Sequence, residues 1–174
     1  MHTLLDTLAR AVAGYLAGQA AAGAQALMVF DTWGGLLGPA QFREFSLRWL
    51  AEIVARLKAD PVARELPIIL FSKGANAHLE ALADTGCAAL GVDWTISIGE
   101  ARKRVGDRVA LQGNLDPVAL AASPDAIKRE VRAVLDDFGA HPGHVFNLGH
   151  GITPDIKPEN VALLVDTVHA LSAR

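Results

Sequence analysis

The sequence has little cysteine and no excess of basic charge, and each shortage excludes a class of protein. Its single cysteine, Cys87, excludes an internal disulfide and fits a reducing cytoplasm. The formal net charge is -3 and the pI is near 6.0, which argues against a nucleic-acid-binding protein, because neutralising phosphates needs a basic face. We interpret the densest basic run, residues 102–104, as a solvated helix face.

Long apolar runs are also missing. None approaches the roughly 20 residues that cross a bilayer, and the amino terminus has no short basic segment ahead of a hydrophobic one. We therefore expect a cytosolic protein without a membrane segment. With 51% hydrophobic residues, 20% charged residues and a mean hydropathy of +0.27, the chain can bury a sizeable core, and we expect one domain over residues 1–174.

Short apolar runs alternate with helical patterns along the chain, which implies a parallel sheet with right-handed crossovers. A closed (β/α)8 barrel uses about 31 residues per unit, so this length should hold about five or six units. The number of strands does not distinguish an open doubly wound sheet from a piece of a barrel. The predicted strands are 26–30, 67–71, 88–92, 109–112 and 144–148, and the predicted helices are 3–22, 39–59, 75–85, 98–105, 124–138 and one from 158 onward.

Helical spacing predicts which faces are buried. In the last helix, Val161, Leu164, Val165 and Val168 should share a face. Ser123, followed by Pro124 and an acid, is a strong signal for a helix start. The first helix should bury Leu4, Leu5, Leu8, Val12, Tyr15 and Leu16, and the second Phe42, Phe45, Trp49, Leu50, Ile53 and Leu57.

Polar residues gather where each predicted strand ends. Asp31 and Thr32 follow the first strand, Lys73 the second and Asp93 the third, and His150 lies between two glycines after the last. In α/β folds the carboxyl ends of the strands are where ligands bind. His150 suits hydrogen bonding to a carboxylate, or proton transfer, because the unperturbed pKa of histidine is close to working pH.

Other chemistries have weaker support. His144 and His150 would lie about 20 Å apart on one strand, at roughly 3.3 Å per residue, so they cannot share a metal ion. The glycines at 34 and 35 lack a nucleotide-binding pattern. Lys73 sits at a turn, where contact with a solvated anion fits better than a Schiff base. We interpret His2, His78, His141 and His169 as surface residues.

Five motifs together closely resemble the carboxyl-terminal half of uroporphyrinogen decarboxylase, which removes carboxyl groups from the four acetate side chains of uroporphyrinogen III in haem biosynthesis. The resemblance runs from end to end of the chain, and the combination of motifs in one order makes it specific. The motifs are FDTWGG at 30–35, GVDWT at 91–95, QGNLDP at 112–117, LDDFG at 135–139 and FNLGHGITPD at 146–155.

The resemblance implies a (β/α)8 TIM barrel of which this chain supplies about the last five strands. It also implies a tetrapyrrole substrate bound at Thr32 and His150, no metal or organic cofactor, and a homodimer. It makes Asp31 and Asp93 structural residues that bond to backbone at the top of the barrel. Trp33 and Trp94 either wall the cleft or pack beneath it, and Asn114 and Asp116 are expected to brace their own loop.

The family's amino-terminal half contributes an arginine-rich motif, an aspartate that holds the pyrrole N–H groups and a tyrosine, and this sequence does not contain those segments. Because decarboxylation needs a carboxylate aimed at the developing positive charge, we expect little or no activity from this chain alone, and we assign no catalytic residue. Two alternatives stay open. One is a half-barrel that assembles with an amino-terminal partner or merely folds; the other is a cobamide-linked methyltransferase, whose zinc ligands are not matched at residues 70–74 or by Cys87.

Overall fold

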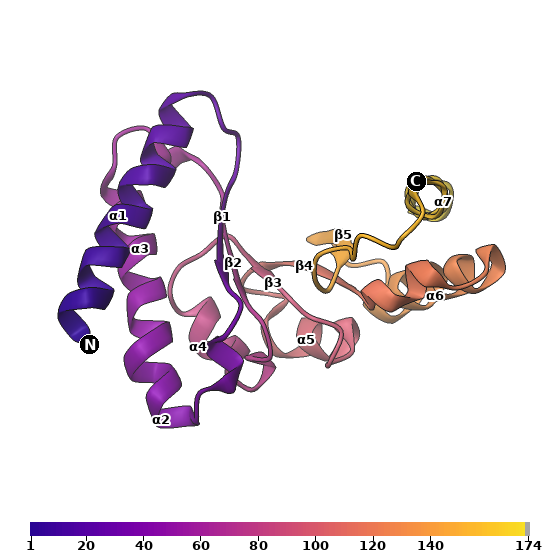
Figure 1. Ribbon diagram of the computed structural model, residues 1–174, viewed down its shortest axis with the longest axis horizontal. Helices are drawn as coiled ribbons and strands as arrows, with labels where there is room; N and C mark the ends of the chain where they lie inside the picture. Colours follow the sequence, from indigo (N-terminus) through magenta and orange to yellow (C-terminus); the bar gives the residue numbers. More distant parts are fainter. Residues whose placement is uncertain (173–174) are drawn as a thin grey trace. The chain divides into compact units, whose positions relative to one another are not determined.

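A computed structural model describes residues 1–172, and the chain divides into two compact units, residues 1–90 and 91–174. Helices and strands alternate in both units (Figure 1). No helix among residues 1–172 is both long and apolar enough to cross a membrane.

The first unit contains two full crossovers, and its helices closely follow the predicted pattern. Its elements are α1 (His2–Ala21), β1 (Leu27–Asp31), η1 (Gly34–Leu36), α2 (Pro39–Phe42), η2 (Arg43–Leu47), α3 (Arg48–Ala59), η3 (Ala63–Glu65), β2 (Ile68–Ser72), η4 (Asn76–His78), α4 (Leu79–Ala83) and β3 (Ala89–Gly91), which ends one residue into the second unit.

The second unit repeats the alternation. The helix at 98–105 has the predicted bounds, and Ser123 caps the helix that follows it, with its hydroxyl accepting a hydrogen bond from the N–H of Ala126 at 3.4 Å. The elements are α5 (Ile98–Val105), β4 (Ala110–Leu115), η5 (Pro117–Ala121), α6 (Pro124–Phe138), β5 (His144–Leu148) and α7 (Pro158–Ser172).

The strand order resolves the choice between an open doubly wound sheet and a piece of a barrel. The order is β1-β2-β3-β4-β5, without the reversal that a doubly wound sheet requires. Sequential parallel strands joined by helices are the pattern of a (β/α)8 barrel. The register is parallel where β1 meets β2, with Leu27 opposite Ile68, and where β4 meets β5, with Leu111 opposite His144.

The first helix does not bury the face that its sequence predicts. α1 packs on α3 through small residues, and its buried positions are Ala9, Ala13, Leu16 and Ala20. Of the predicted stripe only Leu16 is buried, and Leu5 is partly covered. Alanines allow α1 to pack closely on α3, and the larger side chains are left on the open side. The exposed residues are Leu4 (56%), Leu8 (50%), Val12 (36%) and Tyr15 (69%).

The second predicted helix is continuous but contains a π-helical turn, η2, which the sequence analysis missed. Phe42, Leu50 and Ile53 are buried as predicted, whereas Phe45 and Trp49 are only partly buried. A π-turn holds one extra residue, so it shifts the helical face by part of a turn. The shift places the polar Ser46 in the interior instead.

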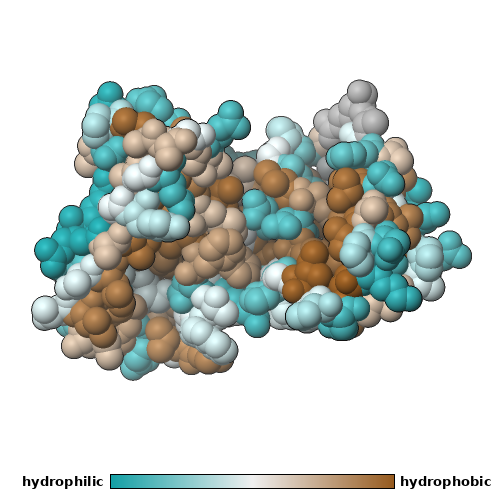
Figure 2. All heavy atoms as spheres, turned by 45° about the horizontal axis from the view of Figure 1, so that its top comes forward, coloured by the Kyte–Doolittle hydropathy of each residue, from teal (hydrophilic) through white to brown (hydrophobic). Residues whose placement is uncertain are grey.

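The core of the second unit forms around α6, where Ile127 and Val131 are completely buried with Leu115 of β4. α7 packs on this core, but the prediction of its buried face is only partly confirmed. Val165 is 42% exposed, and Leu163 packs against the core instead. The last strand also leaves Val145 47% exposed. Figure 2 shows that apolar side chains, in brown, gather in patches on the surface.

Candidate functional site

Asp31 ends β1 and joins three elements of the first unit. One carboxylate oxygen accepts hydrogen bonds from the hydroxyls of Ser46 on η2, at 2.5 Å, and Ser72 at the end of β2, at 3.0 Å. Both serines are buried, at 7% and 6% exposure. The structure therefore agrees with a structural role for Asp31, but the partners of the carboxylate are hydroxyl groups and not the backbone that we expected.

The loops after β1 and β2 are held against each other by backbone hydrogen bonds. The N–H of Lys73 donates to the carbonyl of Asp31 at 3.0 Å, and the N–H of Gly35 donates to the carbonyl of Lys73 at 3.1 Å. Gly34 is buried against the Asp31 cluster so closely that an added Cβ would lie 2.5 Å from the hydroxyl oxygen of Ser72. This close approach explains why glycine follows Trp33 in the motif.

Thr32 lies directly after β1, at the carboxyl end of the strand, and is partly buried. Phe30 precedes it by two residues and is 65% exposed, with its ring edge-on to that of Phe71 at 6.1 Å between centroids. Phe30 is not among the predicted site residues, because an aromatic residue in an apolar strand is typical of a core. An exposed aromatic ring offers an apolar face at this end of the strand.

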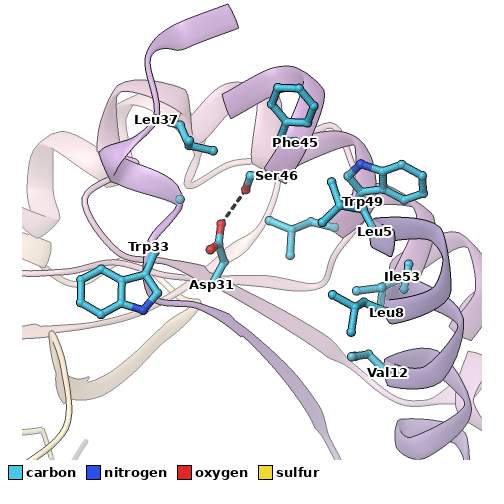
Figure 3. A pocket seen from close by; sticks show the side chains of 13 residues that line it. Leu5, Leu8, Val12, Asp31, Trp33, Leu37, Phe45, Ser46, Trp49 and Ile53 are labelled. Carbon is cyan, nitrogen blue, oxygen red and sulfur yellow. Dashed lines mark hydrogen bonds between the residues drawn. The ribbon is translucent and has the colours of Figure 1, made fainter. Parts of the chain in front are cut away.

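An apolar groove of ≈ 290 Å³ lies beside the Asp31 cluster (Figure 3). Leu5, Leu8 and Val12 of α1 form one wall, and Trp33 and Leu37 lie on the opposite side. The indole N–H of Trp49, which also lines the groove, is buried and has no hydrogen-bond acceptor among residues 1–172. Trp33 itself is 70% exposed. The remaining lining residues are Ala9, Asp31, Gly34, Phe45, Ser46, Leu50 and Ile53.

In the second unit, Asp93 organises the loop after β3. It is 1% exposed, and one carboxylate oxygen accepts hydrogen bonds from the N–H of Thr95 at 2.9 Å and its hydroxyl at 2.6 Å. The amide of Asn114 donates to the carbonyls of Asp93 at 2.9 Å and Ile96 at 2.7 Å. Asn114 thus braces the neighbouring loop, and our expectation that it braces its own was wrong.

The end of β4 also differs from the prediction. The strand continues to Leu115, two residues past the predicted glycine turn, because its backbone stays paired with β5 as far as Leu148. Asp116 then caps the following turn by accepting a hydrogen bond from the N–H of Val118 at 3.0 Å, which confirms the role expected for it.

His150 follows β5 at its carboxyl end and is partly buried. Its ring stands edge-on to that of Trp94, with 6.4 Å between centroids and an interplanar angle of 81°. Gly149 donates its N–H to the carbonyl of Leu115 at 2.7 Å, and an added Cβ there would lie 2.6 Å from the backbone nitrogen of Trp94. The glycine before His150 therefore allows a close approach that sets the imidazole against the indole.

His144 occupies the opposite end of the same strand. Its ring stacks on Phe138 with 4.2 Å between centroids, and its Nε2–H donates to the carbonyl of Gly113 at 2.8 Å. Desolvation by burial lowers the pKa of this imidazole below the ordinary value of 6.5, and the hydrogen bond to Gly113 partly opposes the shift. These contacts belong to the packing of α6 on β5.

Two remaining expectations concern metal ligands and histidines. Within residues 1–172 no three His, Cys, Asp or Glu side chains are grouped so that they could hold a metal ion. Cys87 lies just before β3, as predicted, and desolvation by burial raises the pKa of its thiol. The expectation that His78 is simply a surface residue was wrong, because its ring is partly buried and stacks on Phe42 at 4.3 Å.

Sequential parallel strands, with polar and aromatic residues after their carboxyl ends, define a protein of the (β/α)8-barrel class. The family model for uroporphyrinogen decarboxylase (URO-D) matches residues 1–171. The chain belongs to the uroporphyrinogen decarboxylase family, a family of carboxy-lyases, which confirms the resemblance seen in its motifs.

Individual relatives agree with this assignment. The chain is 56% identical over 173 residues to the uroporphyrinogen decarboxylase of Alcanivorax borkumensis, covering 99% of this chain and 49% of the relative. It is 60% identical over 169 residues to that of Thioalkalivibrio sulfidiphilus, covering 97% of this chain and 48% of the relative. The chain thus spans about half the length of these curated relatives, and it corresponds to their carboxyl-terminal half.

A solved structure supports the fold. The chain is similar to a methyltransferase from Methanosarcina mazei with a TM-score of 0.82 and 27% sequence identity, covering 97% of this chain and 48% of that chain. The similarity extends over both units of the present chain, again against about half of the neighbour.

Proposed function

We propose that this chain supplies the carboxyl-terminal half of the substrate pocket of a uroporphyrinogen decarboxylase, which converts the four acetate side chains of uroporphyrinogen III to the methyl groups of coproporphyrinogen III. The observation that carries the proposal is identity of 52 to 60% to proteins of that name over 97 to 100% of this chain. Thr32 and His150, each placed after the carboxyl end of a strand, are consistent with it.

The residues of this half suit binding better than proton transfer to carbon. The hydroxyl of Thr32 and the imidazole of His150 offer hydrogen bonds to substrate carboxylates, and the exposed ring of Phe30 offers an apolar face to a pyrrole. Within residues 1–172, the carboxylates of Asp31 and Asp93 both accept hydrogen bonds from neighbouring residues of the chain. The carboxylate that meets the developing cation is therefore assigned to the amino-terminal half.

Reconstitution tests this proposal. Residues 1–174 alone should show no turnover of uroporphyrinogen III, whereas their complex with the amino-terminal half of the Alcanivorax borkumensis relative should form coproporphyrinogen III, measured by chromatography of the oxidised porphyrins. Turnover by the isolated chain would refute the division of labour, and a stable complex without turnover would refute the proposed activity.

Site variants in the reconstituted enzyme separate binding from folding. Thr32→Val keeps the shape of the side chain but removes its hydroxyl, and His150→Leu removes the imidazole; each should lower kcat/KM by roughly 10- to 100-fold, as expected when one substrate hydrogen bond of about 1.5–3 kcal/mol is lost. Val62→Ala, on a residue that is 47% exposed and lies before the amino end of β2, is the control and should leave kcat/KM unchanged. Unchanged kinetics in both site variants would remove these residues from the pocket.

A methyltransferase activity is the second candidate, because the structural neighbour carries that name. The 27% identity to that neighbour is well below the identity to the decarboxylases, so we rank it second. A stoichiometric zinc ion in the reconstituted protein, found by metal analysis, would favour it. A homodimer and a cytoplasmic location stay predictions of the family resemblance and of the composition.

A further inference from the structure

The apolar stripe of α1 presents a helix face that the sequence predicts to be buried and that no described residue covers. Leu4, Leu8, Val12 and Tyr15 recur every three or four residues, so they lie on one side of the helix, and they are 36 to 69% exposed. The charged residues beside them, Asp6 and Arg10, pair with each other at 3.1 Å. The stripe itself carries no charge.

The groove beside the stripe is suited to protein side chains. Its volume is ≈ 290 Å³ and its lining is mostly apolar, as a contact with apolar protein side chains requires. Leu5, Leu8 and Val12 form one wall of the groove, so the groove and the stripe make one continuous surface (Figure 3).

The packing within the chain indicates what covers this surface. Consecutive crossover helices pack on each other, as α1 does on α3, α5 on α6 and α6 on α7. α1 leads into β1, which is the first strand of the sheet order and has β2 as its neighbour. A strand before α1 would pair in parallel with β1 through a right-handed crossover, and the helix before that strand would lie against the open side of α1.

The lengths of the relatives supply such a segment. This chain covers 49% of the Alcanivorax borkumensis relative and corresponds to its carboxyl-terminal half. We infer that the stripe and groove of α1, together with the edge of β1, are the docking surface for the last helix–strand segment of the amino-terminal half, with an apolar helix covering Leu4, Leu8, Val12 and Tyr15. This inference rests on the proposed function and names the partner of the same site.

The experiment measures binding and not activity. Purified residues 1–174 are mixed with the amino-terminal half of the Alcanivorax borkumensis relative. The dissociation constant is measured by titration, and the stoichiometry of the complex is measured by light scattering. We expect a one-to-one complex. Leu8→Glu combined with Val12→Glu should raise its dissociation constant at least tenfold, because a docked helix would bury two charges in an apolar contact.

Two further variants keep the result interpretable. Val62→Glu, on a 47% exposed residue of the turn after α3, introduces one negative charge away from the docking surface and should leave binding unchanged. Circular dichroism verifies that each variant is folded, and Tyr15→Glu, on a 69% exposed residue, replaces the double variant if that one unfolds.

Each outcome decides the inference. If the complex forms with the same affinity in the α1 variants, the inference is overturned. It is also overturned if the chain forms a homodimer that the same variants dissociate, because a second copy then covers the stripe. A complex that forms and responds to the variants but lacks turnover supports the docking surface and refutes only the proposed activity.

Discussion

At the scale of single residues, polar side chains near the predicted site serve two different purposes. The carboxylates of Asp31 and Asp93 hold loops together through hydrogen bonds to Ser46, Ser72 and Thr95. His150 instead has an aromatic neighbour, Trp94. Residue type and position in the sequence place Asp31, Asp93 and His150 at strand ends, but only the contacts in the structure distinguish a bracing residue from a candidate ligand.

His144 should make stability depend on pH. Its pKa in the folded chain is below 6.5, so the unfolded chain binds more protons than the folded chain when the pH falls below about that value. The stabilisation is therefore present above pH 6.5 and is lost as the pH falls through the folded pKa. We expect the thermal unfolding midpoint to decrease over this range, as measured by circular dichroism.

A matched pair of variants assigns this effect. His144→Gln should reduce the slope of the unfolding midpoint against pH between pH 7 and pH 5.5, and His169→Gln, on an exposed histidine of α7, should not. An unchanged slope in His144→Gln would show that another group titrates.

At the scale of elements, local signals predicted boundaries well where a cap or a breaker is present. α5 has the predicted bounds because Ser97 caps it, with its hydroxyl accepting the N–H of Glu100 at 3.0 Å. The π-turn of η2 had no such signal; it contains Ser46, whose hydroxyl donates to the carboxylate of Asp31, a contact between residues far apart in the sequence. The length of β4 depends on pairing with β5, which local sequence does not encode.

The cap of α5 can be tested directly. Ser97→Ala should destabilise the chain by about 0.5–2 kcal/mol, because the N–H of Glu100 loses its acceptor at the helix start. Urea unfolding measures the change from the shift in midpoint, and Ser97→Asp, which restores an acceptor, should recover most of the loss. Equal destabilisation by both variants would contradict the cap.

At the scale of the whole molecule, the parallel α/β class and five strands followed from periodicity, and the motifs identified the family that the comparisons confirm. The prediction failed for α1, whose larger apolar residues were assigned to the core. Periodicity reports that a face is apolar, but it does not report whether the covering element lies within the same 174 residues. The placement of Thr32 and His150 in one pocket stays a prediction.

Exposed apolar side chains should make the isolated chain self-associate. Phe30 is 65% exposed on β1 and Val145 47% exposed on β5, the first and last strands of the order, and unpaired strand edges template pairing with other chains. We expect the apparent mass in light scattering to rise with concentration, and to return to that of a one-to-one complex when the amino-terminal half is added.

Phe30→Lys together with Val145→Lys should suppress the rise, because like charges at strand edges oppose pairing. A compact monomer at all concentrations would show instead that these side chains are tolerated in water, and that the chain folds without needing a partner.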